Sequence, residues 1–201
     1  MSSQNRQAMV GTGKMERIYN AGLHTLPFLY VGTFLNIMFP ETGKDVPFTI
    51  ENYAYQDRAG RETVTWIRKF QFPTKLRRFD ATMIYSQQEG RIIDYLGNWQ
   101  HLAVDIDMKV NPNGSLTIFS GNQRFYEGPL AFKFPELFSG NAEVNEAYDA
   151  QEDLFRISVQ VRNKYFGTLF GYTGYFKAEF KNLAPSEIPD YAKPIREEMR
   201  E

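Results

Sequence analysis

The 201-residue sequence contains no cysteine, which excludes disulfide bonds, thiolate metal sites and cysteine nucleophiles. It contains only two histidines, His24 and His101, too few for a three-histidine metal site. The 23 basic and 24 acidic residues leave a net charge of -1, so the chain lacks the basic surface that attracts nucleic acids and anionic membranes. We therefore expect no metal, no other cofactor, no catalytic residue of these kinds and no nucleic-acid partner.

Long apolar runs are also missing. The most apolar segment, residues 26–39, is interrupted by Pro27, Gly32, Thr33 and Asn36. It is shorter than the roughly 20 apolar residues that a membrane-spanning helix requires. We expect this segment to belong to the core and the protein to have no membrane span. The first residues have no apolar centre of the kind a signal peptide needs, and we expect a cytoplasmic protein.

The sequence is rich in aromatic residues, at 15%, and much of it alternates between apolar and polar residues. In residues 101–110, Leu102, Val104 and Ile106 alternate with His101, Asp105 and Asp107, which indicates a strand with one wet face. The strands expected in this way lie near 47–56, 62–72, 78–88, 91–97, 101–110, 115–120, 122–134, 153–161 and 164–181. Short turn signals separate most of them, which favours antiparallel neighbours. The predicted fold is mainly β: one antiparallel sheet, strongly curved or closed into a calycin-like barrel.

The two ends of the chain differ from this central part. Met15, Ile18, Tyr19 and Gly22 recur at helical spacing, so a short amphipathic helix is expected over about 14–23. Residues 1–13 are expected to be a disordered tail, and 182–201, with three prolines and a charged end, a C-terminal tail. The prediction is therefore a single domain over 14–181, with the 14–39 segment against the barrel or over one opening.

Residues 164–180 combine seven aromatic residues with three glycines. At period two, one face carries Phe166, Phe170, Tyr172, Phe176 and Phe180, while the other face is mixed. Glycine weakens a flat strand and is useful where a strand bends or where another backbone or a ligand comes close. We interpret this stretch as a long, coiled strand that closes the sheet and lines its core.

Several short motifs stand out along the chain: Asp57-Arg-Ala-Gly60, Arg68-Lys-Phe-Gln-Phe72, Gly114-Ser-Leu116, Arg124-Phe-Tyr-Glu-Gly128 and Phe166-Gly-Thr-Leu-Phe-Gly-Tyr-Thr-Gly-Tyr-Phe176. Together they resemble an uncharacterised bacterial family, domain of unknown function 4166. The resemblance covers residues 48–180. Leu23-His24 is similar to the family's entry segment, although Thr25 stands where the family has proline. Some members are fused to a saccharopine-dehydrogenase-like module, and none of the motifs is a catalytic signature, so the resemblance implies a fold more than an activity.

Arg68 is the most informative candidate site residue. In the strand expected over 62–72 it shares a face with Val64, Trp66, Phe70 and Phe72. An unpaired charge among apolar side chains costs several kcal/mol, so Arg68 needs a partner. One interpretation is an internal carboxylate, such as Glu146 or Glu127. A second is that Arg68 and Arg124 together bind the carboxylate or phosphate head of a ligand. A third is a bulge that turns Arg68 to solvent.

Three classes of function remain open. The first is a binding module that holds a small hydrophobic or amphipathic ligand in an aromatic-lined barrel. Its expected ligand-binding residues are Arg68, Arg124, Tyr126, Trp66, Tyr172 and Phe176. The second is a structural domain with a packed core and a protein partner. The third is an enzyme or an accessory domain of an oxidoreductase, which the fused relatives imply.

Overall fold

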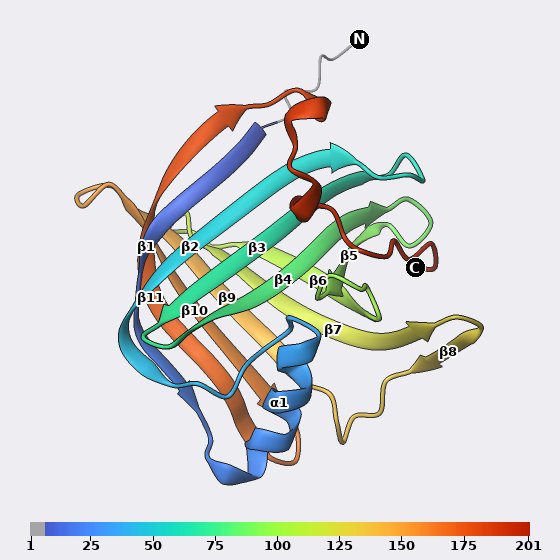
Figure 1. The fold of residues 1–201 in the computed structure, drawn as a ribbon, viewed down its shortest axis with the longest axis horizontal. Helices are drawn as coiled ribbons and strands as arrows, with labels where there is room; N and C mark the ends of the chain where they lie inside the picture. The colour runs from blue at the N-terminus through green and yellow to red at the C-terminus, as the bar shows by residue number, and fades with distance from the viewer. Residues whose placement is uncertain (1–6) are drawn as a thin grey trace.

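The computed structural model describes residues 7–201, which form a closed antiparallel β-barrel (Figure 1). The barrel strands follow the order β6-β5-β4-β3-β2-β1-β11-β10-β9-β7, and β6 pairs with β7 to close the ring. β8 lies outside the ring and pairs only with β7. The sequence-based prediction of a mainly β fold with one antiparallel sheet, strongly curved or closed, is confirmed, and the sheet is closed.

The described residues contain eleven strands, one α-helix and three short 3-10 helices, and ten of the strands form the wall. The strands are β1 (Gln7–Asn20), β2 (Gly43–Gln56), β3 (Glu62–Phe72), β4 (Lys75–Ser86), β5 (Arg91–Leu96), β6 (Leu102–Val110), β7 (Leu116–Glu127), β8 (Leu130–Lys133), β9 (Asn141–Asp149), β10 (Leu154–Asn163) and β11 (Gly167–Asn182). The helical elements are η1 (Leu23–Thr25), α1 (Leu26–Phe34), η2 (Pro185–Glu187) and η3 (Asp190–Ala192).

The N-terminal prediction was wrong, because residues 7–20 form the strand β1 and not a tail followed by a helix. β1 lies between β2 and β11 and pairs with both along nearly its whole length. Met15 and Ile18, three residues apart, both face the core because the register of β1 against β11 shifts between Met15 and Arg17. That irregularity imitates helical spacing in the sequence. Residues 1–6 of the predicted tail lie outside the described residues.

Other parts of the wall also differ from the sequence-based prediction. β9, Asn141–Asp149, is a wall strand that was not predicted, because it carries few apolar residues to mark its inner face. The strands predicted over 115–120 and 122–134 were expected to be separate, but residues 120–122 lie inside β7 and form a bulge there. β6 pairs Val104 with Gln123 and Ile106 with Ser120, so β7 has one extra residue there.

The glycines of β1 and β11 allow the two strands to approach closely. A Cβ atom on Gly13 would lie 2.0 Å from the carbonyl oxygen of Tyr175, and one on Gly174 would lie 2.3 Å from that of Lys14. On Gly171, a Cβ would lie 2.5 Å from the Tyr19 ring. Of the three glycines in residues 164–180, Gly174 thus admits the backbone of β1, as predicted. Gly171 admits the Tyr19 side chain and the Val159 carbonyl oxygen of β10, whereas Gly167 has open space around it.

α1 lies at the lower end of the barrel, beside the connections β8–β9 and β10–β11 (Figure 1). The Phe28 ring contacts those of Phe138 and Phe166, with ring centres 6.0 and 6.2 Å apart. Buried Asn163 holds the two connections together: its Nδ2 donates to the Ser139 carbonyl oxygen at 2.7 Å, and its Oδ1 accepts from the Phe166 N–H at 3.0 Å. A short helix near the N-terminus is present as predicted, but it spans Leu26–Phe34 and not residues 14–23.

Residues 183–201 form a segment, here called the C-terminal strap, that lies across the outer wall of the barrel (Figure 1). Ile188 and Ala192 are buried against Tyr53, Tyr55 and Ile67, whose side chains point away from the barrel interior. The segment predicted to be a C-terminal tail thus covers part of the wall, because apolar residues on the outer faces of β2 and β3 need burial.

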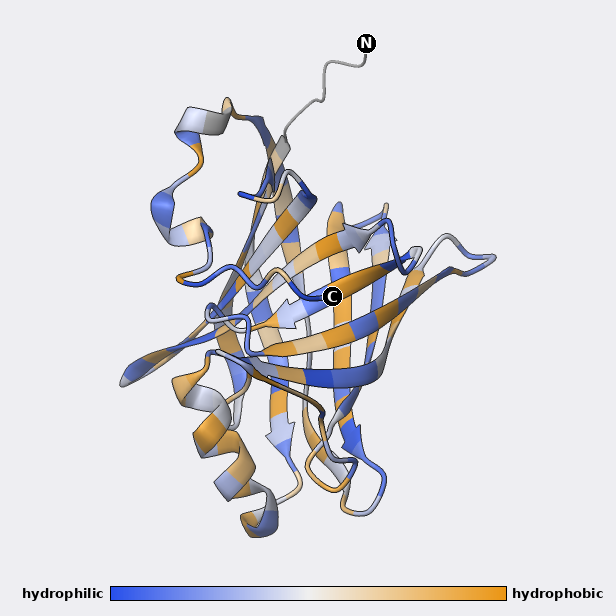
Figure 2. Ribbon diagram, turned by 90° about the vertical axis from the view of Figure 1, so that its right-hand side faces the viewer, coloured by the Kyte–Doolittle hydropathy of each residue, from blue (hydrophilic) through white to orange (hydrophobic). Residues whose placement is uncertain are grey.

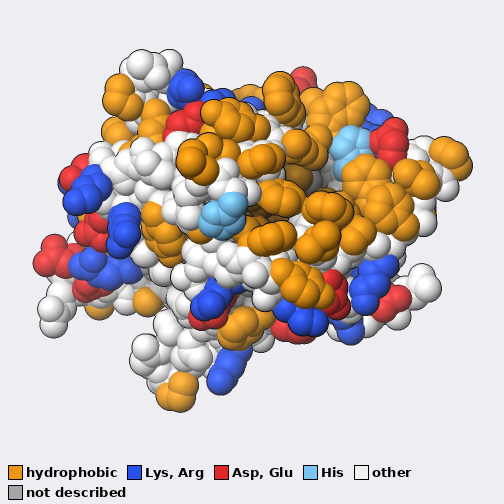
Figure 3. Space-filling view, turned by 90° about the horizontal axis from the view of Figure 1, so that it is seen from below, with side chains coloured by type: hydrophobic (Ala, Val, Ile, Leu, Met, Phe, Trp, Pro, Cys, Tyr) orange, Lys and Arg blue, Asp and Glu red, His pale blue; other side chains and the backbone are white. Residues whose placement is uncertain are grey.

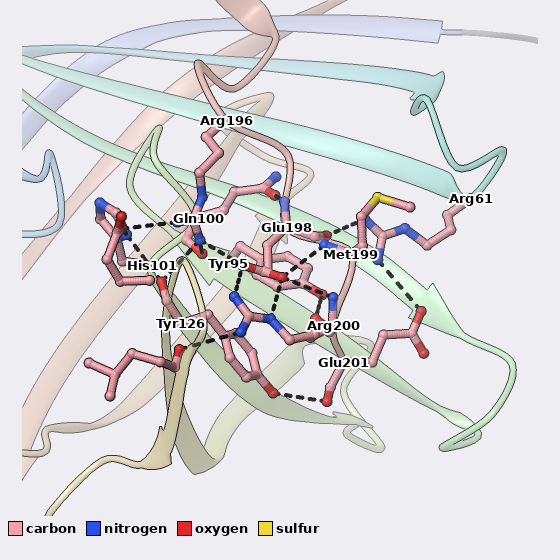
Figure 4. A network of polar contacts seen from close by, with 12 residues as sticks. Arg61, Tyr95, Gln100, His101, Tyr126, Arg196, Glu198, Met199, Arg200 and Glu201 are labelled. Atoms are coloured by element: carbon pink, nitrogen blue, oxygen red, sulfur yellow. Dashed lines mark hydrogen bonds and ion pairs between the residues drawn. The ribbon is translucent and has the colours of Figure 1, made fainter.

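Polar contacts fix the end of the strap (Figure 4). Buried Glu198 accepts hydrogen bonds of 2.7 Å from both Arg196 and Arg200. Burial acts to raise the pKa of Glu198, but the hydrogen bonds and charge of the arginines outweigh it, so the pKa lies below its usual value. Tyr95 and Tyr126 donate to backbone carbonyl oxygens of Arg200 and Glu201, at 2.6 and 3.0 Å.

The barrel interior contains two apolar clusters. The larger one fills the side formed by β1, β2, β3, β10 and β11 and includes an aromatic group: Phe39, Phe48, Phe70, Phe72, Phe170, Tyr172 and Phe176. The smaller one, on β6 and β7, contains Val104, Ile106 and Ile118. Figure 2 shows apolar and polar residues alternating along the wall strands, as a sheet with an apolar inner face requires.

Candidate functional site

A cavity of about 70 Å³ lies inside the barrel between the two apolar clusters. Its apolar lining includes Val104 and Ile106 on one side and Ile157 and Val159 on the other. Ile37 and Met38, from the connection that follows α1, also line it. The polar side chains in the lining are those of Arg68, Asp94, Ser120 and Gln123. The cavity is therefore mostly apolar with a few polar groups, as small-molecule sites usually are.

Arg68 points into the barrel, as its position in the strand predicted. It is 6% exposed, and it stands opposite Phe79 of β4. Its Nε donates a 3.1 Å hydrogen bond to the Phe79 carbonyl oxygen, and its guanidinium carbon lies 3.8 Å from the centre of the Phe79 ring. Among the described residues Arg68 forms no ion pair within 4 Å, so the predicted pairing with Glu146 or Glu127 was wrong. The predicted bulge that would expose it is absent from β3.

Asp94 is the acidic residue of the cavity lining. It is 6% exposed, and its Oδ1 has no hydrogen-bond partner among the described residues. Burial raises the pKa of Asp94 to about 6, while the positive charge of Arg68 acts in the opposite direction. Arg68 and Asp94 are thus coupled through space across the cavity lining, without a close ion pair. A buried acceptor without a partner is costly, and it is the kind of group that a ligand can satisfy.

Three of the other predicted site residues lie in the interior. Trp66 lines the cavity, and the guanidinium of Arg68 lies 5.9 Å from its ring. Tyr172 and Phe176 are fully buried in the larger cluster and do not line the cavity. Burial raises the pKa of Tyr172, and the nearby Arg68 charge opposes this. The Tyr172 hydroxyl has no hydrogen bond of good geometry within the described chain.

Arg124 and Tyr126 lie on the outer wall, away from Arg68. Arg124 pairs with Ala103 in the sheet, whereas its neighbour Gln123 pairs with Val104 and lines the cavity. Arg124 Nη1 forms an ion pair of 2.7 Å with Asp105 Oδ1. The Tyr126 hydroxyl contacts the C-terminal strap (Figure 4). The structure therefore does not bring Arg68 and Arg124 together, because the bulge in β7 reverses the faces of the residues that follow it.

Sequence reasoning missed Asp94 and Gln123. Asp94 lies in Arg91-Ile-Ile-Asp-Tyr-Leu96, where both faces of the strand carry large apolar residues. Alternation cannot show which face is inside such a strand, because the strap buries the outer one. Gln123 follows the bulge, and its Nε2 donates a 2.7 Å hydrogen bond to the Gly140 carbonyl oxygen.

Within residues 7–201, no group of three or more His, Asp or Glu side chains is arranged to hold a metal ion. Within the same residues, no helix has the length and apolar character needed to cross a membrane.

Comparison with known proteins places the chain in a family. The family model described as domain of unknown function DUF4166 matches residues 1–176. The chain belongs to this family. A relative, the uncharacterized protein YndH of Bacillus subtilis (strain 168), is 37% identical over 169 residues, covering 84% of this chain and 82% of that protein. No solved structure matches the chain. The DUF4166 resemblance predicted from the sequence motifs is confirmed.

Proposed function

We propose that this DUF4166 domain is a non-catalytic binding module that holds a small amphipathic molecule in the barrel cavity. The observation that carries the proposal is the unpartnered Oδ1 of Asp94 in the lining of an otherwise apolar cavity. Buried polar atoms are nearly always hydrogen-bonded, so a ligand that donates to Asp94 would remove an energetic cost. The surrounding aliphatic side chains would cover the apolar part of the same ligand.

The size of the cavity limits this ligand. A cavity of about 150 Å³ accepts a molecule of the size of benzene, and the present one has about 70 Å³. A polar group with a few carbon atoms fits this space. A longer ligand would have to displace Ile37 and Met38, which line the cavity from the connection between α1 and β2. Entry from the end of the barrel that carries α1 would move this connection and leave the pairing of the wall strands intact.

Native mass spectrometry of the protein purified from its own host tests the proposal. We expect a co-purified small molecule on the unaltered protein and its loss from Ala142→Leu, because Ala142 lines the cavity and leucine would fill it. Ala131→Leu is the matched control, since Ala131 is exposed on β8, outside the ring. Equal recovery of the molecule on both variants, or none on the unaltered protein, would contradict binding in the cavity.

A protein-interaction role is a second candidate, and the surface around α1 favours it. The apolar side chains exposed there, here called the α1 surface, are Leu23, Tyr30, Val31, Phe34, Leu137, Phe138 and Phe166. Leu23 and Phe34 are each 85% exposed, and apolar side chains gather on the face seen from below (Figure 3). Large exposed apolar areas often mark contact sites for other proteins. A partner retained from host lysate by the unaltered protein and lost with Val31→Ser/Phe34→Ser would support this role, and equal retention by both would contradict it.

A further inference from the structure

The polar part of the cavity contains one positive and one negative side chain. Arg68 and Asp94 are both 6% exposed and both line the cavity, so their charges cancel when both are ionised. The other polar lining side chains are uncharged, and each makes a hydrogen bond to the wall: Ser120 Oγ accepts from the Ala142 N–H at 2.6 Å, and Gln123 Nε2 donates to the Gly140 carbonyl oxygen. Because Arg68 and Asp94 carry the charges of the lining, they interact most strongly with the polar head of a ligand.

These two side chains offer opposite hydrogen-bonding functions. A guanidinium has five N–H donors and no acceptor, and the bond from Nε to Phe79 uses one of the five. An ionised carboxylate only accepts, and Asp94 Oδ1 has no partner within the described chain. A ligand head that both donates and accepts would satisfy the two together.

Arg68 and Asp94 also determine which charge the polar head of a ligand can carry. An anionic head attracted to Arg68 would be repelled by Asp94 in a region of low dielectric, and a cationic head would meet the reverse conflict. An uncharged head meets neither. This excludes the anionic carboxylate or phosphate head that two interior arginines would have favoured, since Arg124 lies outside the barrel.

We propose that the ligand of this cavity has an uncharged polar head with both an N–H or O–H donor and an oxygen acceptor, of the carboxamide type. The head donates to Asp94 and accepts from Arg68, while its carbon atoms contact Val104, Ile106 and Val159. This assignment rests on the proposed binding function and adds the chemical class of the molecule bound.

A matched set of three-carbon probes tests the assignment at pH 7.5: propionamide, propionate and propylammonium. Binding to the full chain is followed by NMR through the indole N–H signal of Trp66, which lines the cavity. We expect propionamide to bind at least tenfold more tightly than either charged probe. Equal or tighter binding of propionate or propylammonium would overturn the uncharged head and leave the proposed binding function standing.

Two variants show whether Arg68 and Asp94 themselves set this preference. Asp94→Asn leaves Arg68 uncompensated and should shift the preference at least tenfold toward propionate, whereas Arg68→Met should shift it toward propylammonium. Arg124→Met, on the outer wall, should leave the preference unchanged. The assignment would be overturned if Asp94→Asn or Arg68→Met folds and its preference among the three probes is unchanged. Absence of binding by all three probes would overturn it as well, and the Ala142→Leu comparison then decides the binding function separately.

Discussion

The guanidinium carbon of Arg68 lies 3.8 Å from the centre of the Phe79 ring, and Arg68 Nε donates to the carbonyl oxygen of the same residue. One residue of the neighbouring strand thus supplies both a cation–π contact and a hydrogen-bond acceptor. This arrangement holds the arginine against the barrel wall without a close ion pair. Asp94 supplies the compensating charge from β5, and the cavity lies beside both residues.

Arg68→Met should lower the free energy of unfolding by roughly 3 kcal/mol or more at pH 7.5, because the buried carboxylate of Asp94 would lose its compensating charge. Urea denaturation measures the change. Arg124→Met is the control, since Asp105 would keep its ion pair with Arg91 at 2.9 Å. An equal loss in the two variants would contradict a special role for the interior arginine.

The free energy of unfolding of Asp94→Asn, relative to that of the unaltered protein, should increase as pH rises. Burial raises the pKa of Asp94 to about 6 from the ordinary 3.8, so the unfolded chain releases this proton at lower pH than the folded one. The unaltered protein therefore loses stability as pH rises from about 4 to 6, and the variant does not. We expect the difference in unfolding free energy to grow by about 2 kcal/mol between pH 4 and 7.5, as one pKa unit corresponds to about 1.4 kcal/mol. Urea denaturation across this range measures it, and the same trend in the exposed control Asp107→Asn would refute the assignment to Asp94.

Gly13→Ala should destabilise the barrel by about 3 kcal/mol, because the added Cβ would lie 2.0 Å from the Tyr175 carbonyl oxygen and force β1 and β11 apart. Gly121→Ala is the control: its Cβ would lie 3.3 Å from the Cβ and 3.6 Å from the carbonyl oxygen of Asp105, with no contact below 3 Å. This substitution should cost less than about 1 kcal/mol. Thermal and urea denaturation compare the two. A Gly13→Ala protein as stable as the unaltered one would show that the strands can separate at little cost.

Glu198→Gln should loosen the C-terminal strap without opening the barrel, because it removes the charge that Arg196 and Arg200 share. A loss of about 1 kcal/mol would speed amide hydrogen exchange in residues 187–199 about fivefold. The pKa of Glu198 is lower in the folded protein than its ordinary value of 4.5. The ionised carboxylate therefore stabilises the strap fully above pH 4.5, and this stabilisation is lost as pH falls through the pKa of the folded state. The two proteins should therefore exchange alike at low pH after correction for intrinsic rates. Faster exchange in the exposed control Glu179→Gln would point to a general effect of charge.

Alternation along the chain was sufficient to predict most of the barrel wall. β3 was predicted over the residues it occupies, and the inward direction of Arg68 and Trp66 followed from position alone. This worked because the side-chain period of a strand is a local property of the backbone. The apolar inner face of β11 was predicted on the same basis for Phe170, Tyr172 and Phe176.

Tertiary structure decided the features that local alternation could not reveal. The irregular register of β1 gave Met15 and Ile18 a helix-like spacing, and only pairing with β2 and β11 makes residues 7–20 a strand. The bulge in β7 turned Arg124 outward, because one extra residue exchanges the two faces of a strand. The strap buried the outer face of β5, so the sequence showed two apolar faces and hid the inward direction of Asp94. Each of these outcomes depends on a neighbour distant in sequence, and for that reason the cavity and its paired charges became visible only in the folded chain.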